Sequence, residues 1–175
     1  MPTADSLATW SRTPLAPDPA LAQQALEQGA CRGEGPVAPQ VVLQDRRTAS
    51  TAAFFLSGPG HWGSCLISVG ASGGSWTNVI PTLFGPISVE EDGNGTVGSD
   101  HAFTLGGLLS PEVGSVQIDR DDGAVVDASV GNGLWLARWP GAATAVKVTA
   151  LDGAGLPIAV LTRTHLGWDV QGAAP

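Results

Sequence analysis

Short apolar runs alternate with turn clusters along the second half of the chain. Five runs lie between Val113 and Arg163: V-G-S-V-Q-I, A-V-V-D-A-S-V, L-W-L-A-R-W, A-V-K-V-T-A-L and L-P-I-A-V-L. The segments between them are rich in Asp, Asn, Gly and Pro. Runs rich in β-branched residues, with turn residues at near-regular spacing, are typical of antiparallel strands joined by tight turns. We therefore predict an antiparallel meander over this stretch.

The run from 134 to 139 carries apolar residues on both of its faces. Side chains alternate between the two faces of a strand. One face holds Trp135, Ala137 and Trp139, and the other holds Leu134, Leu136 and Arg138. A strand of this kind is usually covered on both sides, which indicates a central strand or a sandwich.

The N-terminal half begins with a helix signal. Asp18 is a suitable N-cap, Pro19 suits the first helical position, and an apolar stripe at Leu21, Ala22, Ala25 and Leu26 ends near a glycine at position 29. This segment is the one helix that we predict.

The segments after the helix are assigned by the same signals. We predict a short strand at 41–43, then a hairpin of 50–57 and 61–69 around the three-residue loop Gly58-Pro59-Gly60. Residues 70–78 are predicted to be a flexible loop, and 91–100 a polar loop. Because it contains two prolines, the segment 79–90 is predicted to be an edge strand or an irregular crossing.

Together these signals predict a mainly β fold, an antiparallel β-sandwich or curled meander with one N-terminal α-helix. Residues 1–17 are predicted to be an extended N-terminal arm, which docks through Trp10 or stays partly mobile. Residues 18–175 are predicted to form a single β-rich domain, since a chain of 175 residues suits one domain with a real core.

Charge argues against some partners. The formal net charge is −8, and the sequence holds no Lys/Arg cluster larger than Arg46-Arg47, so nucleic acid is not an expected partner. No apolar run is long enough to span a bilayer, and no basic start with a following apolar stretch appears after Met1. The chain is thus either cytosolic or has lost a leader or anchor, and any membrane association would need an anchor that the sequence lacks.

Two cysteines, Cys31 and Cys65, are too few for a zinc site without help from histidine, and the three histidines show no ligand spacing. We predict a disulfide that ties the segment after the helix to a strand. Such a bond would indicate an oxidising compartment. The alternative is a pair of buried free thiols in a cytosolic protein.

Candidate reactive and metal-binding groups are sparse. Ser64, His61 and Asp45 are the candidates for nucleophilic catalysis, but Ser64 and His61 are three residues apart in a predicted strand and would face opposite sides. A calcium loop would use Asp92, Asn94 and Asp100. It departs from the EF-hand pattern at Val97 and Phe103, so a polar turn is the preferred interpretation. We expect no cofactor.

Two tryptophans suggest one further function, the binding of carbohydrate. Trp62 and Trp76 lie in or near glycine-rich segments and would stack on a sugar if both rings were exposed on one surface. Trp135 and Trp139, on a strand, are assigned to the core.

The late segment D121-D-G-A-V-V-D-A-S-V-G-N-G-L-W-L-A-R-W-P-G141, followed by A145-V-K-V-T-A-L-D-G-A-G155, resembles a known pattern. It is similar to the extracytoplasmic β-rich domain of membrane-anchored or secreted proteins of high-GC Gram-positive bacteria. The earlier A30-C-R, Q44-D-R-R, A52-A-F-F-L and S64-C-L-I resemble the front half of that domain, so the likeness covers about residues 20 to 163. Arg138 stands where a second Trp is common. The resemblance implies fold and compartment, and it carries no activity or catalytic residues.

From these observations we expect a non-catalytic extracytoplasmic interaction or structural module, secreted or at the cell surface. Its partner would be a protein or another ligand of the cell envelope, bound through the segment around Trp76. The alternative is a cell-wall carbohydrate-binding module that uses Trp62 and Trp76.

Overall fold

A computed structural model describes residues 10–33, 39–68, 71–97 and 100–172, with only the backbone described for Val97 and Asp100. These residues form two helices and thirteen strands. They are α1 (Pro19–Glu27), α2 (Gly29–Arg32), β1 (Gln40–Arg46), β2 (Ala52–Gly58), β3 (His61–Ser68), β4 (Ala71–Thr77), β5 (Glu91–Val97), β6 (Asp100–Leu108), β7 (Ser115–Arg120), β8 (Val125–Asp127), β9 (Ser129–Gly131), β10 (Leu134–Pro140), β11 (Ala145–Leu151), β12 (Pro157–Thr164) and β13 (Gly167–Gly172).

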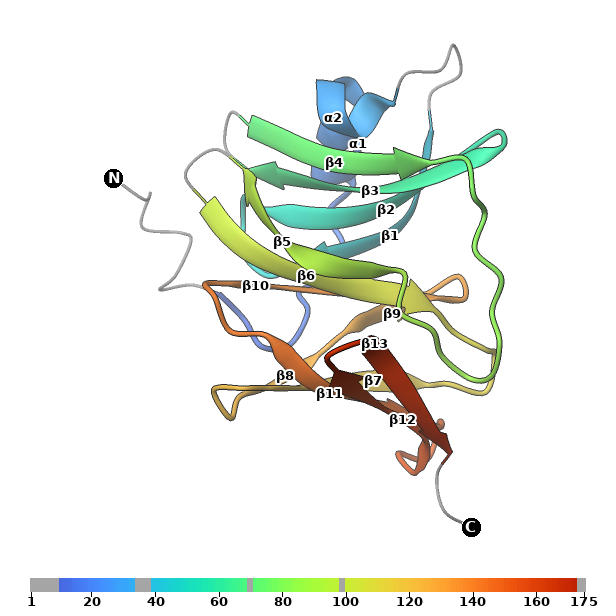
Figure 1. Ribbon diagram of the computed structural model, residues 1–175. Coiled ribbons are helices and arrows are strands. Elements are labelled where there is room, and N and C mark those ends of the chain that lie inside the picture. The colour runs from blue at the N-terminus through green and yellow to red at the C-terminus, as the bar shows by residue number, and fades with distance from the viewer. Residues whose placement is uncertain (1–9, 34–38, 69–70, 98–99, 173–175) are drawn as a thin grey trace.

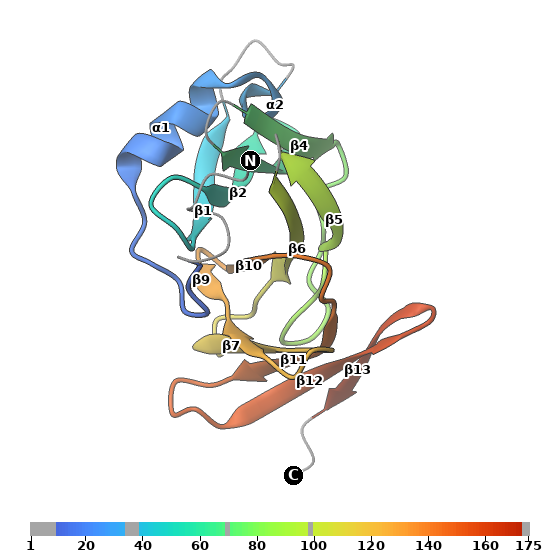
Figure 2. The same ribbon diagram turned by 90° about the vertical axis from the view of Figure 1, so that its left-hand side faces the viewer.

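The strands form three stacked antiparallel sheets (Figure 1). The first sheet has the order β1-β2-β3-β4, the second β5-β6-β10-β9 and the third β13-β12-β11-β7-β8. The two helices cover the outer face of the first sheet, and the second sheet lies between the other two (Figures 1 and 2). The predicted mainly β, antiparallel architecture with a short N-terminal helix is confirmed.

The helix begins where the sequence predicts. The Asp18 side chain accepts a hydrogen bond of 2.9 Å from the Ala20 N–H, and Pro19 occupies the first turn, where a missing N–H costs nothing. Leu21 and Ala25 are buried against the first sheet. The next helical turn, α2, carries Cys31.

Cys31 and Cys65 form a disulfide, with their Cα atoms 5.3 Å apart. The bond joins α2 to the middle of β3, so the predicted pairing is confirmed. Both sulfurs lie in the apolar layer between the helices and the first sheet, together with Phe54, Leu56 and Ile67. The bond therefore fixes the helical layer on the outer face of that sheet. A disulfide in the structure is consistent with an oxidising, extracytoplasmic environment.

Two further apolar layers separate the sheets, as expected for a strand that is buried on both faces. Between the first and second sheets lie Ala53, Phe55, Leu134 and Leu136. Between the second and third sheets lies a larger cluster that includes Trp135, Ala137 and Trp139. The alternation along β10 thus divides its side chains between the two interiors, as the sequence predicts.

The predicted meander of the second half is wrong in its connections. The run from 124 to 130 is not one strand, because it breaks at Ala128 into β8 of the third sheet and β9 of the second. The successive strands β10 and β11 also belong to different sheets. Consecutive strands form the hairpins β7–β8, β9–β10 and β11–β12, and pairs of strands distant in sequence, β6 with β10 and β7 with β11, join these hairpins into sheets. The run lengths predicted strands correctly, but they hold no information on which sheet each strand joins.

Two predicted loops are strands. Residues 70–78 contain β4, which pairs with β3 from Ala71↔Ser68 to Thr77↔Trp62. A Cβ at Gly74 would lie 2.6 Å from the Ser64 carbonyl oxygen and 3.1 Å from that of Ala30, so glycine allows β3 and α2 to approach β4 closely. Strand pairing and packing here outweigh the loop-like composition.

Likewise, residues 91–100 contain β5 and the first residue of β6 rather than a polar loop. The two strands pair from Glu91↔Gly106 to Val97↔Asp100. The segment 79–90 is irregular, as predicted, with one isolated bridge between Ile87 and Leu109. The predicted β2–β3 hairpin forms with a two-residue loop, since Gly58 pairs with His61.

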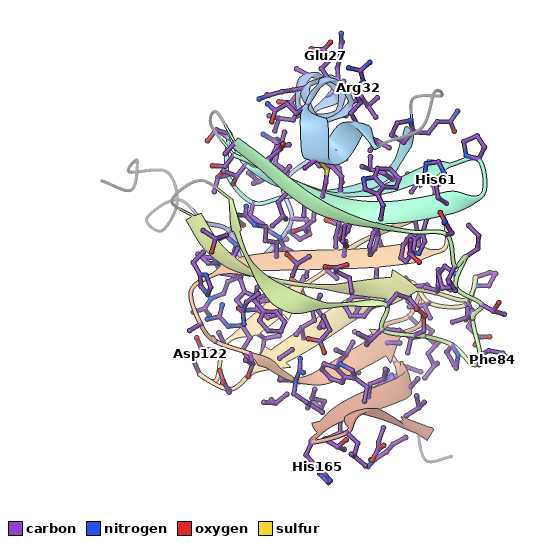
Figure 3. The ribbon with its side chains drawn as sticks, turned by 45° about the horizontal axis from the view of Figure 1, so that its top comes forward. Glu27, Arg32, His61, Phe84, Asp122 and His165 are labelled. Carbon is purple, nitrogen blue, oxygen red and sulfur yellow. A yellow bond between two sulfur atoms is a disulfide. The ribbon has the colours of Figure 1, made fainter. Side chains whose placement is uncertain are left out.

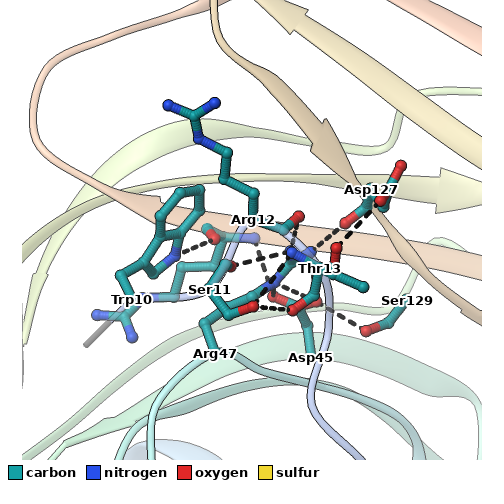
Figure 4. A network of polar contacts seen from close by, with 9 residues as sticks. Trp10, Ser11, Arg12, Thr13, Asp45, Arg47, Asp127 and Ser129 are labelled. Carbon is teal, nitrogen blue, oxygen red and sulfur yellow. Dashed lines mark hydrogen bonds and ion pairs between the residues drawn. The ribbon is translucent and has the colours of Figure 1, made fainter.

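A buried ion pair links the three sheets (Figure 4). Asp45 at the end of β1 is fully buried, and the Arg47 guanidinium lies 2.8 Å from its carboxylate. The same carboxylate accepts hydrogen bonds from the Ser129 hydroxyl at 2.7 Å and the Arg138 backbone N–H at 3.0 Å, both in the second sheet. Arg47 also donates to the backbone oxygen of Asp127, at the end of β8 in the third sheet.

The arm segment lies against this network. Arg47 donates to the Arg12 carbonyl oxygen at 2.7 Å, and the Trp10 indole N–H donates to the Arg138 carbonyl oxygen at 3.1 Å. Leu15 forms an isolated bridge with Arg46. Residues 10–17 of the predicted arm are therefore docked on the sheets, and residues 1–9 lie outside the described part of the chain.

Candidate functional site

A cavity of about 210 Å³ lies between the first and second sheets. It is lined by residues of β2, β3 and β4 on one side and of β5 and β6 on the other. β4 and β5 are edge strands of neighbouring sheets and are not hydrogen-bonded to each other. They lie side by side in both ribbon views (Figures 1 and 2). The cavity therefore occupies the place where two sheet edges approach without pairing.

Strand register explains why polar groups line this cavity. Ser64 lies opposite Ser75 in the β3–β4 pair, so both point to the same face of the first sheet. In the second sheet Gly93 lies opposite Thr104. Because side chains alternate along β5, Glu91 shares the face of Gly93 and so points toward the cavity.

Ser64 and Glu91 meet across the gap between the sheets. The Ser64 hydroxyl donates a hydrogen bond of 2.8 Å to a carboxylate oxygen of Glu91. Burial raises the pKa of the Glu91 carboxyl above its ordinary value, and the neighbouring charge of Asp92 acts in the same direction, while the Ser64 hydrogen bond lowers it. Burial is the largest of the three effects, so the pKa is raised overall.

Thr104 brings a second polar group to the cavity. The residue is only 5% exposed, and its hydroxyl oxygen has no hydrogen-bond partner among the described residues. A buried hydroxyl is normally paired, because its desolvation costs about 1 to 3 kcal/mol otherwise. Next to it, a Cβ added at Gly93 would meet no atom within 4 Å. The cavity thus has open space beside an unsatisfied polar group.

Neither Glu91 nor Thr104 was among the site residues predicted from the sequence. The signal for Glu91 is the alternation E-D-G-N-G-T-V, in which positions 91, 93 and 95 share one strand face. The interpretation of this segment as a loop hid that alternation. For Thr104 the sequence carries no comparable signal, since a threonine within an apolar strand is unremarkable.

The candidate nucleophile and its bases are not assembled. Ser64 faces the cavity, whereas His61 lies at the β2–β3 turn, with its Nδ1 2.9 Å from the Pro59 carbonyl oxygen. Figure 3 shows His61 close to the helical layer and His165 at the opposite end of the molecule. Asp45 is held by Arg47 in the buried ion pair. The described side chains thus do not bring Ser64, His61 and Asp45 together.

Trp62 and Trp76 lie on opposite faces of the first sheet. Trp62 pairs with Thr77 and Trp76 with Gly63, which places the two indoles on different sides. Trp62 packs on Phe55 between the sheets, with ring centroids 4.9 Å apart. Trp76 packs on the helical layer, and its indole N–H donates to the Ala30 carbonyl oxygen at 3.1 Å. The two rings do not share a surface on which a sugar could stack.

The described side chains do not assemble the weak metal candidate either. Asp92 faces the third sheet, where its two oxygens accept from Arg163 and from the Trp168 indole N–H, each at 2.8 Å. Asn94 lies on the same strand, and the side chain of Asp100 lies outside the described part. Across the described residues, no group of three or more His, Cys, Asp or Glu could hold a metal ion.

Comparison of the chain with protein-family models, with curated proteins and with solved structures finds no match. The resemblance of its motifs to extracytoplasmic domains of high-GC Gram-positive bacteria therefore stays a prediction. No helix in the described part of the chain is long and apolar enough to cross a membrane.

Proposed function

We propose that the protein is a non-catalytic extracytoplasmic binding module, secreted or attached to the cell surface, that takes a small polar ligand in the cavity between the first two sheets. One observation carries this proposal: Thr104, a residue that lines the cavity, has a buried hydroxyl without a hydrogen-bond partner among the described residues. A ligand that satisfies this group would recover the free energy lost on burying it.

The compartment is supported by the Cys31–Cys65 disulfide, because such bonds persist mainly in oxidising environments. The ligand would accordingly be a component of the cell envelope or of its surroundings.

A binding role fits the site better than catalysis does. Ser64 donates its proton to Glu91 in the hydrogen bond, and His61 points elsewhere. Activation of a serine needs a base within hydrogen-bond reach and a third group that orients the base. Ser64 and Glu91 provide a pair without the orienting partner. Turnover of a generic ester that Ser64→Ala abolishes would overturn the non-catalytic part of the proposal.

The test is a titration of small polar compounds and envelope-extract fractions into isotopically labelled protein, followed by NMR. We expect the backbone amide signals of β3 to β6 to shift with a bound ligand. The matched control is Gly93→Val, which places a side chain in the open space and suits a strand. The proposal fails if no compound or fraction produces shifts that this variant abolishes.

A further inference from the structure

The described residues that line the cavity between the first two sheets include one acidic side chain and no basic one. The polar side chains on the strand faces that meet there are Ser64, Ser75, Glu91 and Thr104, whereas Asn94 and Thr96 of the lining lie on the strand face of Asp92. Lys, Arg and His are absent from the described residues that line the cavity. Its one charged side chain is therefore the Glu91 carboxylate.

Basic side chains nearby do not neutralise this carboxylate. Arg163 lies 2.8 Å from Asp92, the next residue along β5, but it does so on the opposite face of the strand. Arg163 also donates to the Ala145 carbonyl oxygen at 2.6 Å. The Arg163 guanidinium thus pairs with groups at the interface between the second and third sheets. The described polar contact of Glu91 is the hydrogen bond that it accepts from Ser64.

A partly buried carboxylate without a counter-charge is destabilised by desolvation, and it gains from a proton or from a bound cation. The raised pKa of Glu91 reflects that cost. A ligand that brings a positive charge would remove it. The Glu91 carboxylate therefore disfavours the binding of anions in the cavity and favours the binding of cations.

Geometry narrows the kind of cation. An ammonium group has three N–H donors and no acceptor, and the cavity offers it the Glu91 carboxylate and the unpartnered Thr104 oxygen as acceptors. A quaternary ammonium has no N–H and relies on aromatic faces. Phe54 is the one aromatic residue of the lining, and its ring belongs to the layer on the other side of the sheet.

Metal ions fit less well. Calcium takes six to eight oxygen ligands and usually several carboxylates, whereas this lining supplies one carboxylate. The volume of about 210 Å³ holds roughly seven water molecules at ~30 Å³ each and lies below the range of about 300 to 1,000 Å³ usual for drug-sized ligands. The occupant is therefore a small organic molecule.

Resting on the function proposed above, we propose that the cavity selects a small primary ammonium compound, whose –NH₃⁺ group pairs with Glu91 and donates a hydrogen bond to Thr104. Hydroxyl groups of the same ligand would meet the remaining polar side chains. Amino alcohols and amino sugars are compounds of this class.

The experiment measures binding of two matched pairs of probes by NMR titration at neutral pH: ethanolamine against ethylene glycol, and glucosamine against glucose. We expect each amine to bind at least about tenfold more tightly than its neutral partner, because its ammonium group adds a charge-assisted hydrogen bond to the Glu91 carboxylate. Glu91→Gln should remove this preference. Glu90→Gln, the same change at the exposed neighbouring position, should leave it intact.

The pH dependence of amine binding gives a second readout. The charged residues next to Glu91 in the chain are the exposed Glu90 and Asp92, and the charge of Asp92 acts on its pKa, while the described residues that line the cavity from β2, β3, β4 and β6 are uncharged. Amine binding requires the carboxylate, so affinity should fall as the pH drops through the pKa of Glu91. In Glu91→Gln this dependence should disappear.

Three results would overturn the ammonium assignment. Equal binding of the neutral probes, abolished by Gly93→Val, would refute it while leaving a ligand-binding cavity. Calcium binding that Glu91→Gln abolishes would replace it with a metal site. Failure of every probe to bind would also refute it, and the extract titration with Gly93→Val would then decide separately whether the cavity binds any ligand.

Discussion

Glu91 and Asp92 are adjacent in β5, yet their carboxyl groups face different sheets. Glu91 accepts a hydrogen bond from Ser64 of the first sheet, and Asp92 accepts from Arg163 and Trp168 of the third. Asp92 has a cationic partner, whereas Glu91 has a neutral one. One acid therefore stabilises an interface between sheets, and the other is left in a cavity at a cost to stability.

Replacement of Glu91 by Gln should stabilise the protein at neutral pH. The folded-state pKa is raised above the ordinary value of 4.5, so the folded protein binds the proton more tightly than the unfolded chain does. Stability from this group is therefore full below that value and is lost as the pH rises through the folded-state pKa. The difference between Glu91→Gln and the parent protein should be small in acid and favour the variant at neutral pH.

Thermal unfolding followed by circular dichroism over a pH series measures this effect. Glu90→Gln serves as the control, because Glu90 is exposed and its replacement should give a nearly flat difference. A destabilising effect of Glu91→Gln at neutral pH would contradict the assignment of Glu91 as an acid that the fold does not need.

Glycine at position 74 should be far less replaceable than glycine at 93. A Cβ at Gly74 would lie 2.6 Å from the Ser64 carbonyl oxygen and 2.8 Å from the Cys65 Cβ, whereas one at Gly93 meets nothing within 4 Å. Gly74→Ala should cost about 1 to 3 kcal/mol of unfolding free energy through overpacking. Gly93→Ala should be neutral or stabilising, since alanine restricts the unfolded chain.

Urea denaturation of the two variants provides the comparison, because both change one glycine in an edge strand to alanine. Equal losses would show that the close contacts of β4 with β3 and α2 are not as described.

Replacement of one partner of the buried ion pair between Asp45 and Arg47 should strongly destabilise the protein. Asp45→Asn leaves the Arg47 guanidinium, only 2% exposed, without its counter-charge and should cost about 3 to 5 kcal/mol. Asp119→Asn breaks the ion pair with Lys147, in which the side chains are 35% and 47% exposed, and should cost at most about 1 kcal/mol. Chemical denaturation of the two variants measures this contrast, and similar small losses would contradict burial of the first pair.

Removal of the disulfide should lower stability by about 4 kcal/mol, as the chain-entropy model gives for cysteines separated by 34 residues. The measurement is urea unfolding of the variant Cys31→Ala, Cys65→Ala beside the parent protein. Thiol titration of the unfolded, unreduced parent should find no free thiol from either cysteine. Two titratable thiols would instead support the cytosolic alternative.

Much of the fold could be predicted from local patterns. The N-cap at Asp18 with Pro19, the alternation along β10 and the hairpin around Pro59 depend on near neighbours in sequence, and the structure confirms each of them. The disulfide could also be predicted, since Cys31 and Cys65 are the two cysteines of the chain.

The remainder depends on contacts between distant segments. At Ala128 the chain passes from the third sheet to the second, and the backbone there is held by Arg12 and Arg47 from the other end of the sequence. β4 and β5 have glycine-rich or polar compositions typical of loops, and they are strands because a partner strand satisfies their backbone groups. The cavity could not be predicted for the same reason, because β4 and β5 are two of the five strands that line it.

The passage of the chain through Ala128 bears on how the molecule could be dissected. Since consecutive short strands belong to neighbouring sheets, a fragment cut at this point would lose strand partners from both halves at once. Piecewise expression of either end should yield insoluble or unstructured material, and labels or fusions are better placed at the hairpin tip near His165, at the end of the molecule opposite the helices (Figure 3).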